Sequence, residues 1–189
     1  MKKILMAALL LAPALALPAG AVTDDGVTVG SRSGVSFGGR GSYFKPKNAA
    51  DGNWSGGAQL RLHMGPIWAL EGSGDIRQDR FGGTTVDVIP VQASLLAYLL
   101  PGKVVSPYLL AGAGWYYTHV RDANDSTYHR FGPHAGGGLQ AFLNKHWSID
   151  GSARHIWLSS YRSQDAANPL GRDIDASGWM ATAALNYHF

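Results

Sequence analysis

The sequence alternates apolar and polar residues one by one in eight separate stretches that follow its first 21 residues. In the closing stretch, WMATAALNYHF at residues 179–189, Trp, Ala, Ala, Leu, Tyr and Phe occupy every second position. Successive side chains of a β-strand point to opposite faces, so this period of two predicts strands with one apolar face. No stretch after residue 21 carries the 3.6-residue apolar period of an amphipathic helix. The alternation therefore predicts an all-β protein.

The spacing of the stretches indicates how the strands are connected. Each has roughly the 9–11 residues that a tilted strand needs to cross a bilayer. Short turns at 64–66, 100–106 and 144–147 alternate with longer polar loops at 45–53, 78–84, 119–129 and 159–178. An even number of antiparallel strands with this alternation is the pattern of outer-membrane barrels. The predicted strands cover residues 33–45, 54–64, 67–77, 85–99, 107–118, 130–143, 147–157 and 179–189.

The polar faces of these strands carry charges of both signs, while the opposite faces carry Leu, Ala, Val and Trp. A soluble exported barrel would place the apolar face inside, but an eight-stranded interior is only just wide enough for side chains to fill. Rows of Trp and Tyr at strand ends fit an outer girdle better than that space. We therefore expect a polar network in the lumen made by Arg40, Arg61, Glu71, Asp75, Arg77, Gln140, Asp150 and Arg154.

Aromatic residues gather near the ends of the predicted strands. Amphipathic rings concentrate at the two membrane–water interfaces, where one side of the ring is apolar and the other is wet. These residues predict two girdles on the outside of the barrel. They are Tyr43, Trp54, Trp68, Trp115, Tyr117, Trp147, Trp157, Trp179, Tyr187 and Phe189.

Barrel closure follows from the same inside-out arrangement. In hydrocarbon every backbone N–H and C=O needs an internal partner, so a sheet can cross a membrane only if it closes on itself. We expect the eighth strand to pair with the first, with Phe189 against lipid at the periplasmic rim. The predicted fold is an eight-stranded antiparallel transmembrane up-and-down β-barrel.

The first residues, MKKILMAALLLAPALALPAGA, combine two lysines, an apolar run and Ala-Gly-Ala. This order is typical of a secretory signal peptide, so we predict a signal peptide at residues 1–21 and the barrel domain at 22–189. The chain has no cysteine, and therefore forms no disulfide. Without Lys2 and Lys3 the 16 basic residues become 14 against 13 acidic ones, which gives no reason to expect nucleic-acid binding.

Three segments resemble a known family. The terminal ALNYHF is similar to the end signature of bacterial outer-membrane barrels. The segment IPVQASLLAYLLPGKVVSPYLLAGAGWYY resembles the hairpin of strands four and five in small eight-stranded barrels. HAGGGLQAFLNKHWSIDGSARHIW resembles their hairpin of strands six and seven. The resemblance is to the OmpA-like, OmpX-like and OmpW-like barrels, and it implies a fold rather than an activity.

Two interpretations of the lumen charges remain open: a plug of ion pairs, or a gated ion path. A narrow eight-stranded barrel favours the plug. Some small barrels modify lipid A, so ARHIWLSS is of interest. However, the alternation places His155 on the lipid face, out of register with Ser159 and Ser160, and no catalysis is predicted. The seven histidines are scattered, and neither a metal site nor a cofactor is predicted.

We expect a small surface protein of the Gram-negative outer membrane, reached through the periplasm after signal-peptide cleavage. Its expected role is structural and interfacial, with loops that contact lipopolysaccharide or external partners. Barrel-assembly machinery is expected to bind the last strand, ending in Phe189, and the barrel is expected to be a monomer. The alternative is passage of small hydrophobic molecules or ions. The OmpW-like resemblance implies it, and an apolar patch in the upper lumen would serve it: Leu96, Tyr98, Leu110 and Tyr116.

Overall fold

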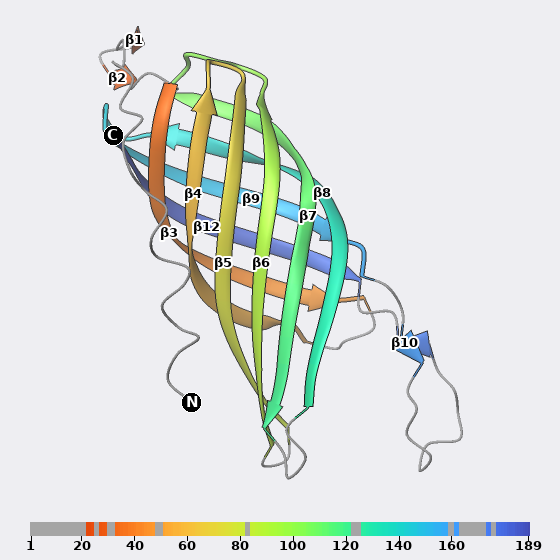
Figure 1. The fold of residues 1–189 in the computed structure, drawn as a ribbon. Helices are drawn as coiled ribbons and strands as arrows, with labels where there is room; N and C mark the ends of the chain where they lie inside the picture. The colour runs from red at the N-terminus through yellow and green to blue at the C-terminus, as the bar shows by residue number, and fades with distance from the viewer. Residues whose placement is uncertain are drawn as a thin grey trace.

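Eight long antiparallel strands form a closed barrel in the computed structural model of the chain (Figure 1). The structure describes residues 22–24, 27–29, 33–47, 51–81, 84–121, 126–158, 161–162, 173–174 and 177–189, so the predicted signal peptide lies outside the described residues. No helix in this described part is long and apolar enough to span a membrane. In sheet order the strands are β12 (Gly178–His188), β3 (Ser33–Pro46), β4 (Asn53–Met64), β5 (Trp68–Phe81), β6 (Thr84–Tyr98), β7 (Val105–Arg121), β8 (Ser126–Phe142) and β9 (Trp147–Ile156).

The last strand closes the barrel, as the alternation predicted. β12 pairs with β9 on one side and with β3 on the other, from Gly178 opposite Pro46 to His188 opposite Ser36. The backbone N–H of Phe189 donates to the carbonyl of Val35 at 3.1 Å, so pairing continues to the last residue. No edge strand is left within this ring, which is the condition for crossing hydrocarbon.

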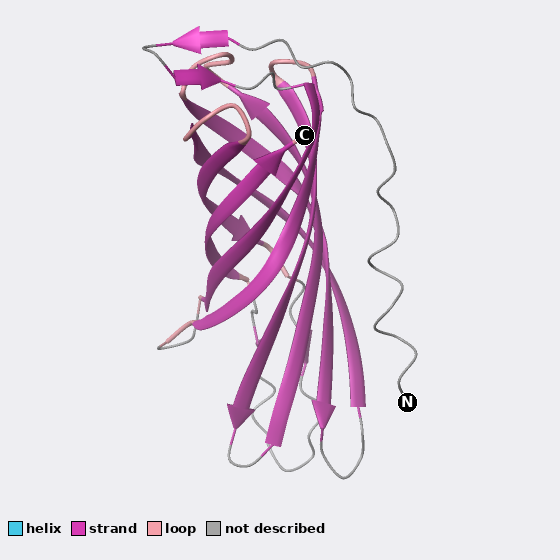
Figure 2. Ribbon diagram, turned by 90° about the vertical axis from the view of Figure 1, so that its left-hand side faces the viewer, coloured by secondary structure: helices cyan, strands magenta, loops and turns pink. Residues whose placement is uncertain are grey.

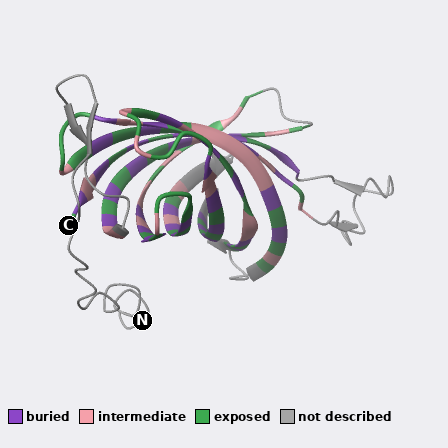
Figure 3. Cartoon of the chain, turned by 90° about the horizontal axis from the view of Figure 1, so that it is seen from above, coloured by how far each residue is buried: buried purple, intermediate pink, exposed green. Residues whose placement is uncertain are grey.

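Burial alternates along the strands with a period of two. In β12 and β9 nearly every second residue is buried and its neighbours are exposed (Figure 3). The exposed set is apolar and includes Leu70, Leu109 and Leu185, each more than two-fifths exposed. The buried set is dominated by Ser, Gln, Arg, Asp and His. The barrel is therefore polar inside and apolar outside.

Three tight turns join the strands at one end of the barrel. They connect β4 to β5, β6 to β7 and β8 to β9. Gly65 and Gly102 adopt φ values of 106° and 84° in the first two turns, a backbone region that residues with a Cβ rarely occupy. This end corresponds to the periplasmic side of an outer-membrane barrel, where turns are short.

Two of the four longer loops were predicted too long. β5 and β6 pair as far as Phe81 opposite Thr84, so most of the expected loop at 78–84 is strand. β7 and β8 likewise pair as far as Val120 opposite Ser126, inside the expected loop at 119–129. Backbone pairing itself needs no apolar alternation, so the sequence signal disappears where a strand continues without an apolar face. In Figures 1 and 2, β5, β6, β7 and β8 extend beyond the other barrel strands at the long-loop end.

Two small hairpins lie outside the barrel ring. β1 (Val22–Asp24) pairs with β2 (Val27–Val29) ahead of the first barrel strand. β10 (Tyr161–Arg162) pairs with β11 (Asp173–Ile174) within the long connection between β9 and β12. The second hairpin falls within the predicted loop at 159–178.

Candidate functional site: the barrel lumen

Six charged side chains meet in the middle of the lumen. Arg40 comes from β3, Arg61 from β4, Glu71 and Asp75 from β5, and Asp150 and Arg154 from β9. Each is 6% exposed or less. The alternation explains their meeting, because each sits on the inward face of its strand. Six of the eight residues predicted for the lumen network thus form one cluster, which we call the charge cluster: Arg40, Arg61, Glu71, Asp75, Asp150 and Arg154.

Arg61 is the most connected member of the charge cluster. Its Nε donates to Glu71 Oε2 at 2.6 Å and its Nη1 donates to Asp150 Oδ2 at 2.9 Å. Its guanidinium carbon also lies 5.3 Å from the centre of the Tyr108 ring. Arg61 is therefore held between two carboxylates from different sides of the barrel.

The other two arginines complete the charge cluster. Arg40 forms a two-point contact with Asp75, with Nη2–Oδ2 at 3.0 Å and Nε–Oδ1 at 3.1 Å. Arg154 Nη2 lies 3.4 Å from Glu71 Oε1. Because β9 and β5 are four strands apart in either direction around the ring, this last contact crosses the full width of the lumen.

The formal charges of the cluster cancel, with three arginines against three carboxylates. A lone buried charge costs several kcal/mol or more, so balance and close pairing are what permit this density of charge away from bulk water. Hydrogen bonds with neutral residues add to the pairing: Tyr108 donates to Asp150 Oδ1 at 2.9 Å, and Gln92 Oε1 accepts from Arg154 Nη1 at 3.2 Å.

The remaining two predicted network residues lie apart from the charge cluster. Gln140 is fully buried towards the short-turn end, where its Nε2 donates to Ser148 Oγ at 2.9 Å, and Ser148 in turn contacts His188 at 2.8 Å. Arg77 is half-buried, and its guanidinium carbon is 5.5 Å from the ring centre of Phe44. Both lie on the inward faces of their strands, as predicted.

The predicted lumen network left out polar residues that lie on the same inward strand faces. Tyr108 is 1% exposed and contacts Asp150 and Arg61, yet it stands in the apolar-looking run YLL. Gln92 donates to the Tyr116 hydroxyl at 2.8 Å. Gln59 donates to Asn186 Oδ1 at 2.7 Å over the intervening strand β3. Each lies in phase with the inward residues of its own strand, so strand phase rather than residue type was the available signal.

Two apolar clusters lie above and below this polar layer. Ala69, Leu96, Tyr98, Tyr108 and Leu110 pack together towards the short-turn end. Phe44, Tyr116, Ile156 and Met180 pack together towards the long-loop end, with Leu158 against them.

The predicted apolar patch in the upper lumen is therefore wrong in its placement. Leu96, Tyr98 and Leu110 belong to the short-turn cluster and Tyr116 to the other. Leu96, Tyr98 and Leu110 flank the turn that joins β6 to β7. Because this turn is one of the three short ones, these residues lie at the short-turn end and not at the upper end.

The predicted girdle aromatics are exposed or half-buried, as outward side chains are. One group is nearer the long-loop end and includes a pair from β3 and β4, Tyr43 and Trp54, with ring centres 5.1 Å apart. The other group is nearer the short-turn end and includes Tyr187, whose ring centre lies 5.1 Å from those of both Trp147 and Phe189. The long-loop group is Tyr43, Trp54, Trp115, Tyr117, Trp157 and Trp179, and the short-turn group is Trp68, Trp147, Tyr187 and Phe189.

His155 lies on the outer wall, as the alternation predicted. The centre of its ring lies 4.8 Å from that of Trp157 and 5.2 Å from that of Trp179, so its neighbours are aromatic. Ser159 and Ser160 lie outside the described residues.

Comparison with known proteins agrees with this architecture. A family model described as "Outer membrane protein beta-barrel domain" matches residues 7–189. No curated protein has a sequence that matches the chain significantly.

Solved structures of bacterial outer-membrane barrels share the fold at low sequence identity. The N-terminal β-barrel domain of Pseudomonas aeruginosa OprF is 13% identical with a TM-score of 0.62, over 84% of this chain and 99% of that one. Neisserial surface protein A is 12% identical with a TM-score of 0.63, over 82% and 96%. Ail, the attachment invasion locus protein of Yersinia pestis, is 17% identical with a TM-score of 0.52, over 82% and 96%.

Proposed function

Because the chain belongs to the outer membrane protein β-barrel domain family, we propose that it is a plugged barrel of the bacterial outer membrane that acts through its outer surface. The observation that carries this proposal is the layered filling of the lumen. A charge-balanced polar layer lies between two apolar clusters, and its six charged side chains are at most 6% exposed. An ion moving along the axis would have to displace both apolar clusters and separate the ion pairs.

The filled lumen favours the plug over passage of ions or small hydrophobic molecules. A hydrophobic route would need a continuous apolar path, but the two apolar clusters are separated by the charge cluster. Catalysis finds no support in ARHIWLSS, because His155 packs between two indoles on the outer wall. We therefore assign the function to the outer wall and the loops.

On this proposal the partners are those a membrane-embedded surface meets. Lipopolysaccharide surrounds the long-loop end, and external partners meet the loops. The barrel-assembly machinery engages β12 with its terminal Phe189, and the assembled barrel works as a monomer. The signal-peptide route through the periplasm belongs to the same proposal, since such barrels assemble from the periplasmic side.

Conductance in planar bilayers tests the plug. The purified protein is expected to give no steady current, because no open path runs through the lumen. A lumen-clearing variant should give discrete current steps, since it removes the closest ion pair together with one large residue of each apolar cluster: Arg61→Ala, Glu71→Ala, Leu96→Ala and Tyr116→Ala.

Leu62→Ala with Leu70→Ala is the matched control. These residues occupy the next rung of the same two strands but face outward, so the control should remain silent. Steady current from the unaltered protein, equal to that of the lumen-clearing variant, would refute the plug.

A further inference from the structure

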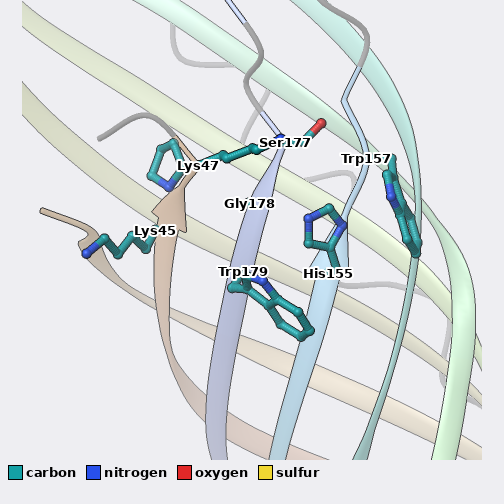
Figure 4. Close-up of a pocket in the computed structure, with 8 residues that line it drawn as sticks. Lys45, Lys47, His155, Trp157, Ser177, Gly178 and Trp179 are labelled. Atoms are coloured by element: carbon teal, nitrogen blue, oxygen red, sulfur yellow. The ribbon is translucent and has the colours of Figure 1, made fainter. Parts of the chain in front are cut away.

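A hollow of about 430 Å³ lies on the outer wall at the long-loop end of the barrel (Figure 4). Three strands build it, with Lys45 on β3, Trp179 on β12 and His155 on β9. Lys47 and Trp157 lie just beyond the strand ends. We call these five residues the rim site. Figure 4 shows His155 between the two indoles, with Lys45 to the other side of Trp179.

From this site we propose that the barrel binds one phosphorylated glycolipid of the outer leaflet, lipid A. The headgroup phosphate would sit at Lys45 and Lys47, and an acyl chain would run down the wall below Trp179. This inference rests on the proposed function, because it names the partner of the outer surface that the plugged barrel leaves available.

Charge complementarity selects an anionic headgroup. Both lysines are exposed, and none of the described residues that line the hollow is a carboxylate. A lysine ammonium is a compact positive charge that binds phosphate oxygens through charge-assisted hydrogen bonds. The aromatic wall completes the match, since indole rings sit at the headgroup level of a bilayer with one edge in contact with acyl chains. The site therefore offers cations and apolar surface together, which a phosphorylated acyl lipid needs.

The wall below the rim site is unusually smooth. On β9 and β12 the outward residues there are Gly or Ala and exposed, and Tyr43 on β3 is the one larger outward side chain beside them. A Cβ added at Gly41 or Gly151 would meet nothing within 4 Å. A groove of about 610 Å³ begins at the level of Gly151 and Ala183 and continues towards the short-turn end. The smooth residues are Gly41, Gly151, Ala153, Ala181 and Ala183.

The dimensions agree with one leaflet. From Trp179 to Ala183 the strand rises about 13 Å at roughly 3.3 Å per residue, which is about 10 Å along the membrane normal at the tilt of roughly 35–45° that such strands have. Half of the hydrocarbon thickness of a bilayer is about 15 Å. An acyl chain lying on this smooth strip would therefore cover about two thirds of the half-thickness before it reaches the groove.

Native mass spectrometry of the delipidated protein in detergent, titrated with bis-phosphorylated lipid A, tests the proposal. The unaltered protein should retain one lipid A per barrel. Lys45→Ala with Lys47→Ala should weaken binding about 30-fold, from about fivefold per lysine. Lys145→Ala is the matched control, since this exposed lysine lies in the β8–β9 turn at the opposite end, and binding should not change.

Two further arms separate the headgroup from the acyl chains. Dephosphorylated lipid A should bind the unaltered protein as weakly as lipid A binds the double lysine variant. Gly151→Leu should also weaken lipid A binding, because its side chain occupies the smooth strip. Gly72→Leu should not, although Gly72 is equally exposed and has equally open space around it on β5.

Equal lipid A affinity for the double lysine variant and the unaltered protein would overturn the proposal. So would equal binding of phosphatidylglycerol, since the rim site would then attract any anionic lipid. Heat-dependent gel mobility checks that each variant is folded. An open lumen in the conductance experiment would refute the plug without affecting any of these lipid measurements, so the two proposals fail separately.

Discussion

Two successive rungs of the β4–β5 ladder face opposite environments. Arg61 pairs with Glu71 on one rung, and Leu62 pairs with Leu70 on the next. Arg61 is 1% exposed and lies in the lumen, whereas Leu62 is 41% exposed on the outer wall. In a soluble protein the same pattern would place the leucines inside and the ions outside. The comparison shows that the strands are defined by their period, while the position of lipid decides which face is buried.

The largest effect should come from leaving a lumen charge without its partner. Arg61→Met removes the cation from Glu71 and Asp150, which it contacts at 2.6 and 2.9 Å. The free energy of unfolding, measured by urea titration in phosphatidylcholine vesicles, should fall by about 3–5 kcal/mol, as for other broken buried pairs. Arg61→Lys, which keeps the charge, should lose less. A loss below about 1 kcal/mol would mean that water solvates the lumen carboxylates, and the lumen would then not be a plug.

The same charge placed on the other face should cost somewhat less. Leu60 points outward at the middle of β4, between the inward residues Gln59 and Arg61. Leu60→Arg should lower the free energy of unfolding in vesicles by about 2–4 kcal/mol, the cost of an arginine at the bilayer midplane. Met64→Arg, at the end of the same strand and face, should cost only about 0–1 kcal/mol because its charge reaches the interface. Equal costs at the two positions would contradict the membrane position assigned to β4.

The lumen and the wall also differ in how far the sequence could predict them. The apolar wall and the inward face of each strand follow from the period of two alone, so the charge cluster members were identified residue by residue. Which partners meet was not predictable, because the Glu71–Arg154 contact depends on strands β5 and β9 lying opposite each other around the ring. The alternation did not predict where the strands end. In β5 and β7 polar residues continue the strand past the apolar segment, where no lipid requires alternation.

The rim site on the outer wall was likewise not predictable from the sequence alone. Lys45 is more than a hundred residues from His155 and Trp179 in the chain, yet Trp179 pairs with both of them, with Lys45 on β3 and with His155 on β9. The aromatic residues were predicted as girdle members one at a time. Only closure of the barrel, which sets the last strand beside the first, brings the lysines and indoles into one hollow. A single sequence predicts the faces of such strands but gives no register between distant strands.

The smallest expected effect is the difference in coupling energy between one side-chain pair in the lumen and one on the outer wall, both in the long-loop half of the barrel. Arg40 and Asp75 form a two-point ion pair in the lumen, whereas Tyr43 and Trp54 form an aromatic pair on the wall. Double-mutant cycles with Arg40→Met and Asp75→Leu should give a coupling energy of about 1–3 kcal/mol in vesicles. Cycles with Tyr43→Ala and Trp54→Ala should give about 0.5–1.5 kcal/mol. Raising salt should leave both couplings nearly unchanged, because the lumen pair is shielded from bulk ions and the aromatic pair carries no charge. A lumen coupling that falls with salt to the value for the wall pair would show that Arg40 and Asp75 are hydrated, and the two faces would then differ less than the ladder implies.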